Sequence, residues 1–253
     1  PEVTLQGIRL LRIMLPIAGL CWITAGIIVT IGMRGRTSNR RAEDSPGKPF
    51  RWVIITGLLV AAFVVRIPLL GQSLWYDEIV AFWYYGQHGP GAILGNMFTP
   101  ANHVLQSLGS WASVSISGGS LEEWTLRLPA LLAGLLSAWP IYIIGRRGLG
   151  STGAVIAVAV MLFMPIAITE GTEARGYALM LLFGSSSSAL LLCALEDRRI
   201  ELLPLYALVC TLGIWSHLVT VVVPAGHAIN IETCCAAATR GCKLWRRRHR
   251  RAA

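Results

Sequence analysis

The sequence predicts an all-α fold, a polytopic bundle of transmembrane helices in which a large first outer loop carries interfacial helices. Hydrophobic residues make up 54% of the 253 residues and charged residues only 14%, which is far from the balance of a soluble globular chain. Several apolar stretches also reach the roughly 20 residues that one helical crossing of a bilayer needs. We therefore expect an integral membrane protein that contacts membrane lipids.

Seven stretches are candidate crossings, and a tight turn at Ser216 and His217 separates the last two. They cover residues 10 to 33, 52 to 70, 128 to 145, 151 to 169, 177 to 195, 200 to 216 and 217 to 238. Segment 104 to 119 is short and rich in Ser and Gly, which makes it a weak spanning helix.

Four regions follow from these stretches. They are an extra amino-terminal transmembrane helix (1–33), a basic cytoplasmic linker (34–51), a transmembrane domain (52–238, outer loop 71–127) and a basic cytoplasmic tail (239–253). Because the chain starts with Pro1, we expect it to be part of a longer reading frame.

The positive charges set the predicted orientation. Lys and Arg total 22 against 13 acids, and the surplus sits in the linker, in GRRGLG (145–150), in EDRR (196–199) and in the tail. The positive-inside rule puts all four in the cytoplasm, which is consistent only if 104 to 119 lies along the outer interface without crossing. Short basic loops suit anionic lipid, and we expect no nucleic-acid partner. The six cysteines have no metal-ligand or disulfide spacing, so we interpret them as free thiols.

This orientation places the polar and ionisable residues that lie outside these basic clusters together on the outer side. They are Asp77, Glu78, Asn102 with His103, Glu122, Glu123, Glu170, Glu173, Arg175 and His217. Charges near the membrane are costly and often functional, so we expect an active site on the extracytoplasmic face, in a bacterial plasma membrane.

Asp77 and Glu78 follow the second crossing in LWYDE. One interpretation is an aromatic belt with two solvated acids that begin a surface helix. The other is that one carboxylate acts as a general base. Adjacent acids cannot share one helical face, so one would face the substrate while the other organises the loop or binds a cation. A divalent cation stays possible, although one acidic pair is a poor cage.

The remaining candidates also have two interpretations each. His103 is either a hydrogen-bonded structural residue or a phosphate contact. Arg175 either pairs with Glu173 or binds a phosphate in a bidentate manner, with Tyr177 as a further hydrogen-bond donor. Arg127 suits an interfacial anchor beside Pro129, which fits the first turn of a helix. His227 is expected to pack between helices with a backbone partner.

Several motifs in order carry a family resemblance: LWYDE, NHVLQSL, EEWTLRLPALLAGLL, GRRGLG, EARGYAL and WSHLVTVVVPAGHA. Over residues 52 to 232 they resemble the amino-terminal half of GT-C glycosyltransferases. The most similar group uses polyprenyl-phosphate sugars and includes dolichyl-phosphate-mannose protein mannosyltransferases and the lipid A aminoarabinose transferase. Many relatives have Pro after the His, where this chain has Val104, and their carboxy-terminal spans and outer domain are missing here.

The resemblance implies site roles and a reaction. Asp77 would be the catalytic base and Glu78 its partner, and the donor phosphate or acceptor would be held by Asn102, His103, Arg175 and Tyr177, with Glu173 and His217 as further candidates. The expected reaction is an inverting hexosyl or pentosyl transfer from a polyprenyl-phosphate-linked sugar to a hydroxyl of an acceptor lipid, glycan or protein. Two alternatives stay open: a truncated, non-catalytic relative that binds lipid or a partner, and a multi-spanning transporter or lipid-flipping component. The latter would place ionisable residues near mid-membrane, where the spans show few.

Overall fold

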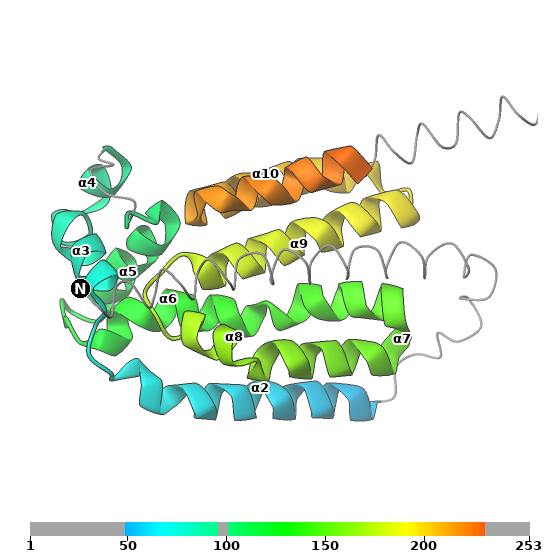
Figure 1. Cartoon of the computed structure of the whole chain (residues 1–253), viewed down its shortest axis with the longest axis horizontal. Helices are drawn as coiled ribbons and strands as arrows, with labels where there is room; N and C mark the ends of the chain where they lie inside the picture. Colours follow the sequence, from blue (N-terminus) through cyan, green and yellow to red (C-terminus); the bar gives the residue numbers. More distant parts are fainter. Residues whose placement is uncertain (1–48, 96–100, 231–253) are drawn as a thin grey trace, which may run out of the picture.

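The computed structural model describes residues 49–95 and 101–230, and every regular element in these ranges is a helix (Figure 1). The elements are α2 (Pro49–Leu70), α3 (Tyr76–Tyr84), η1 (Gly86–His88), α4 (Pro90–Gly95), α5 (Val104–Ile116), α6 (Glu123–Leu136), α7 (Ala138–Phe163), α8 (Pro165–Glu170), α9 (Tyr177–Glu196), η2 (Ile200–Leu202), α10 (Leu203–Ser216) and η3 (Leu218–Val221). Residues 222–230 continue as helix. The all-α prediction is confirmed, while the predicted helix 1–33, most of the linker and the tail lie outside the described residues.

Three described stretches are long and apolar enough to cross a membrane: Phe50–Leu70, Glu123–Phe163 and Tyr177–Glu196. The second has 41 residues and is not one rod, because Gly150 has φ 79° and reverses the chain inside α7. The two halves then pack closely, since a Cβ added at Gly145 would lie 2.9 Å from Ala154 Cα. The predicted break at GRRGLG is therefore confirmed.

Two predicted boundaries are wrong. Helix α6 begins at Glu123, so Pro129 lies inside the helix and not in its first turn. The crossing predicted over 151 to 169 ends at Phe163, because Met164 has extended backbone (ψ 129°) and Pro165 starts α8. A proline lacks an N–H and suits the first position of a helix, which explains the break.

The helices pack through small and branched side chains. Between α2 and α7 the buried residues are Ile55, Ala62, Ala138, Tyr142, Ala154, Val158 and Leu162. Between α6 and α9 they are Ala130, Ala133, Ala178 and Leu179. Small residues let helix backbones approach closely, which is how membrane helices associate. The opposite face of α2 exposes large apolar side chains such as Val60 and Val64, as expected for contact with lipid.

Arg66 is a buried cation within α2 that is held by backbone oxygens. Its guanidinium donates to the carbonyl oxygens of Ala62 (3.0 Å), Leu162 (3.0 Å) and Ala167 (3.1 Å). The last two oxygens lie beside the break between α7 and α8, where helical hydrogen bonding is interrupted. Arg66 therefore fastens this break to α2.

The bundle has two distinct ends. Figure 1 shows α3, α4 and α5 together at one end, and the chain reversal in α7 at the other. We call the first the α3 end; it also holds the connection between α8 and α9. The second is the Gly150 end, where Arg147 pairs with Glu196 (2.7 Å) and Asp197 (2.6 Å). Helix α5 has 13 residues, too few to cross a bilayer, which agrees with the prediction for 104 to 119.

Candidate active site

Glu78 forms a buried ion pair with Arg127 at the α3 end. Each residue is 2% exposed. The pairing is bidentate, with Nε of Arg127 3.0 Å from Glu78 Oε1 and Nη2 2.7 Å from Oε2. The carboxylate also accepts from the backbone N–H groups of Trp75 (2.8 Å) and Ala174. The Trp75 bond caps the first turn of α3, as a glutamate at the third helical position commonly does.

Arg127 also binds the chain that leaves α2. Its Nη1 donates to the carbonyl oxygens of Leu69 (3.1 Å), Leu70 (3.1 Å) and Gln72 (2.7 Å), and Nη2 donates to Ser73 (3.2 Å). This one side chain thus joins α6, the end of α2 and, through Glu78, the start of α3 and the loop before α9. We call the Glu78–Arg127 pair with these carbonyl oxygens the arginine clamp. The predicted interfacial anchor role of Arg127 is wrong, because its guanidinium lies inside the protein.

Asp77, by contrast, points to the open side of α3. Its side chain is 46% exposed and forms an ion pair with Arg175, a residue 98 positions away in the chain. Arg175 also donates to Glu173 Oε2 at 3.2 Å, and its guanidinium lies 5.5 Å from the centre of the Tyr177 ring. Adjacent acids therefore face different ways, as predicted: Glu78 organises the loop, and Asp77 is accessible beside a cation.

Three rings lie next to this ion pair. The His103 and His217 rings stack with centres 4.9 Å apart, and Tyr177 lies 4.8 Å from His217 and 5.9 Å from His103. Burial, then the nearby His217 and Arg175, lower the pKa of His103 from 6.5 to about 4. Burial, then Arg175, also lower the pKa of His217. Both rings are therefore neutral at pH 7 and can each offer an N–H donor.

The tautomer of His217 follows from its hydrogen bond. Its Nδ1 accepts from the backbone N–H of Val219 at 3.2 Å, so the ring proton of the neutral form is assigned to Nε2. The rings come from three separate segments, the start of α5, the start of α9 and the turn after α10. They are thus brought together only by the tertiary fold.

Asn102 does not face this group. Its side chain is 4% exposed, donates to the Ile93 carbonyl oxygen at 2.9 Å and accepts from Ser107 Oγ at 3.1 Å. These bonds join α4 to the start of α5 and so hold His103 in place. The two ring nitrogens of His227 also bind side chains, Ser188 (3.0 Å) and Tyr206 (3.1 Å), and not the backbone partner that was predicted.

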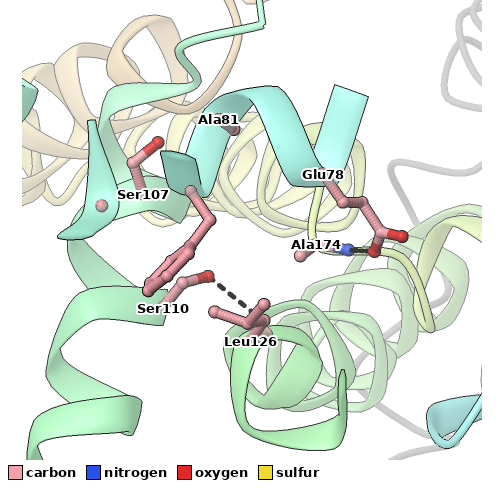
Figure 2. A pocket seen from close by; sticks show the side chains of 8 residues that line it. Glu78, Ala81, Ser107, Ser110, Leu126 and Ala174 are labelled. Carbon is pink, nitrogen blue, oxygen red and sulfur yellow. Dashed lines mark hydrogen bonds between the residues drawn. The ribbon is translucent and has the colours of Figure 1, made fainter. Parts of the chain in front are cut away.

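A small cavity lies behind the catalytic candidates. Figure 2 shows Glu78 on its wall, with Ser110 donating to the Leu126 carbonyl oxygen at 2.7 Å on the opposite side. The cavity has room for about one water molecule, which is far too little for a sugar.

Metal-ligating side chains do not cluster in the part of the chain that the structure describes, where no group of three or more His, Cys, Asp or Glu residues lies together. Glu78 already uses both oxygens within the arginine clamp. Asp77 is paired with Arg175. The acidic pair as it stands therefore does not form a cation cage.

Sequence reasoning missed the structural roles of Arg127 and Arg66. A usable signal was present for both, because an arginine inside an apolar helical stretch is normally paired or bound to backbone oxygens. The sequence did not indicate that Glu78 is the partner of Arg127, since 49 positions separate the two residues.

Comparison with protein families decides the family of the chain. A family model described as dolichyl-phosphate-mannose-protein mannosyltransferase matches residues 108–242, more than half of the 253 residues. The chain belongs to this family. Comparisons with curated proteins and with solved structures gave no match.

As a member of the dolichyl-phosphate-mannose-protein mannosyltransferase family, the chain is a membrane glycosyltransferase of the GT-C type, and the resemblance stated from its motifs is confirmed. The match begins within α5. It includes Arg127 and the whole connection from α8 to α9 with Glu173, Arg175 and Tyr177. Asp77 and Glu78 precede the matched range, and the ion pairs described above connect them to it.

Proposed function

We propose that the chain transfers a sugar from a polyprenyl-phosphate donor to an acceptor hydroxyl, with inversion at the anomeric carbon and with Asp77 as the base. The observation that carries the proposal is the ion pair between Asp77 and Arg175. In it an accessible carboxylate and a guanidinium, a group suited to binding phosphate, lie together at one end of a bundle of this family. The family description names a dolichyl-phosphate-mannose donor, and the proposal extends to related polyprenyl-phosphate-linked hexosyl or pentosyl donors.

Donor binding would rearrange this ion pair. A guanidinium binds phosphate in a bidentate manner, so the donor phosphate competes with Asp77 for Arg175. The Asp77 carboxylate is then released to receive a proton from the acceptor. The neutral rings of His103 and His217 and the Tyr177 hydroxyl lie beside Arg175 and can donate further hydrogen bonds to phosphate oxygens.

The transfer is a single displacement. The acceptor oxygen forms a bond to the anomeric carbon while Asp77 takes its proton. The bond from that carbon to the phosphate oxygen breaks, and the electron pair leaves with the polyprenyl phosphate. Because the charge that develops is on the phosphate, the main electrostatic work falls to Arg175 and the donors near it.

The buried neighbours hold these groups in position. The arginine clamp fixes the first turn of α3, and with it Asp77. Glu173 orients Arg175, and Asn102 fixes the start of α5 next to His103. We therefore assign Glu78, Glu173 and Asn102 as positioning residues, and Asp77, Arg175, His103, Tyr177 and His217 as groups that contact substrate.

The distribution of basic residues supports an assignment of the reaction to one side of the membrane. Arg146 and Arg147 in the turn of α7 and Arg198 and Arg199 after α9 all lie at the Gly150 end. Under the positive-inside rule this end is cytoplasmic, which puts Asp77 and Arg175 on the extracytoplasmic face. We propose the plasma membrane of a bacterium as the compartment.

The test uses membranes that contain the chain and a panel of radiolabelled polyprenyl-phosphate sugars. Asp77→Asn should lower the transfer rate by about 100-fold or more, as loss of a general base does. Asp197→Asn is the matched control, because Asp197 is at the Gly150 end. Equal transfer by wild type and Asp77→Asn would exclude Asp77 as the base. Cysteines introduced at positions 77 and 175 should react with an impermeant reagent from the same, extracytoplasmic side.

A further inference from the structure

Glu170 is the last residue of α8 and lies at the edge of the α3 end. Its Oε2 atom is buried and has no hydrogen-bond partner among the residues that the structure describes. An ionised carboxylate oxygen without a donor is costly to bury, whereas a protonated carboxyl group is much less so. Neither the arginine clamp nor the ion pair of Asp77 uses this side chain, so its role needs a separate explanation.

Burial and the neighbouring Glu173 favour the protonated form of Glu170. Glu173 and Arg175, in the loop that follows α8, interact electrostatically with Glu170. Tyr177, at the start of α9, does so as well. From α6, Arg127 is already paired with Glu78; from α2, Arg66 is bound to backbone oxygens. The half of α7 beside α8 has no ionisable side chain. Burial, then Glu173, raise the pKa of Glu170 to about 7, and Arg175 opposes the shift.

The proposed reaction builds negative charge on the departing phosphate, which a proton donor beside Arg175 would relieve. Breaking the bond to the anomeric carbon leaves a phosphate monoester, whose second pKa is about 6. A proton donor transfers most effectively when its own pKa is close to the working pH and to that of the receiving group. Arg175 supplies positive charge but cannot give up a proton at this pH.

We propose that Glu170 is a second catalytic carboxyl group, which in its protonated form donates a hydrogen bond, and then its proton, to the departing polyprenyl phosphate held by Arg175. This inference rests on the proposed function. The carbon–oxygen bond to phosphate breaks with its electron pair on the phosphate oxygen, and that oxygen takes the proton of Glu170. Asp77 receives the acceptor's proton, and both carboxyl groups then exchange with water. The net reaction moves one proton from the acceptor hydroxyl to the phosphate.

Binding of the released product, polyprenyl phosphate, tests this role without an acceptor. The full chain in lipid nanodiscs would be titrated with polyprenyl phosphate at pH 6 and pH 8, for wild type and Glu170→Gln. Ionised Glu170 repels the phosphate, whereas glutamine remains neutral. The affinity of wild type relative to Glu170→Gln should therefore fall about tenfold from pH 6 to pH 8. Ionisation of the phosphate affects both proteins equally and cancels in this ratio.

Two further arms keep the result interpretable. Glu123→Gln, the same change at another acid of the α3 end, should follow wild type at both pH values. Polyprenyl sulfate carries a charge that does not titrate in this range, so its binding to the unmodified chain should itself weaken about tenfold between pH 6 and pH 8. This second measurement needs no variant to fold.

The outcomes separate the two proposals. A wild-type to Glu170→Gln ratio that does not change with pH, or sulfate binding that is independent of pH, overturns the role of Glu170 and leaves the proposed function standing. If the unmodified chain binds no polyprenyl phosphate at all, the proposed function fails and this inference fails with it. In the transfer assay, Glu170→Gln should lower kcat while the donor KM at pH 6 stays close to that of wild type.

Discussion

Replacing Arg127 with methionine tests whether the arginine clamp holds the α3 end together. The change leaves the Glu78 carboxylate in the interior without its cation, and removing one partner of a buried ion pair costs about 3–5 kcal/mol. Both side chains are nearly inaccessible, 2% and 0%, so little water can replace the guanidinium. Four backbone carbonyl oxygens also lose their donor. We therefore expect a loss near the upper end, about 5 kcal/mol.

Thermal unfolding of the purified chain in detergent measures this loss. A destabilisation of that size should lower the unfolding midpoint by on the order of 10 °C. Arg147→Met is the matched control, because its partners Glu196 and Asp197 are 29% and 44% exposed, and such surface pairs contribute about 0–1 kcal/mol. If the two variants unfold at the same temperature, the clamp does not stabilise the fold and the argument from burial is wrong.

Two further predictions concern the rings and the helix contact beside them. Because the pKa of His103 is lowered to about 4, the unfolded chain binds more protons than the folded chain below pH 6.5, so stability must fall as the pH falls from 6.5 toward 4. We expect His103 to contribute a loss of about 1.5 kcal/mol between pH 6.5 and 5 in wild type, and His103→Gln to lose less, measured as unfolding midpoint against pH; parallel curves would contradict this. Gly176→Ala should lower the midpoint, because the added Cβ would overlap the Ser216 carbonyl oxygen. In Gly184→Ala the added Cβ would lie 3.6 Å from Val223, an ordinary contact distance, so the midpoint should not fall. Similar shifts in both variants would rule out the close contact at Gly176.

Local patterns account for the features that were predicted correctly. Apolar length identifies a crossing without knowledge of its neighbours, and the glycines of GRRGLG mark the reversal at Gly150. Because the basic loops must all lie on one side of the membrane, the number of crossings between them puts Asp77 and Arg175 at the same end of the bundle. This holds although 98 positions separate the two residues. The two boundary errors have different origins. Charged residues near the start of α6 obscured where that helix begins, and Pro165 was not recognised as the start of a new helix after Met164.

Sequence alone determined the helical class, the apolar stretches that can cross a membrane, the family and several of the polar residues that meet at the α3 end. Tertiary structure decided which of two adjacent acids is exposed. Neighbouring residues of a helix point about 100° apart, and only the buried guanidinium of Arg127 fixes Glu78 inward and leaves Asp77 beside Arg175. It also directed Asn102 into the protein and, among the described residues, left the Oε2 atom of Glu170 buried without a hydrogen-bond partner. The side chain that pairs with a buried charge comes from a segment far away in the sequence, and the packing of the helices decides which segment that is.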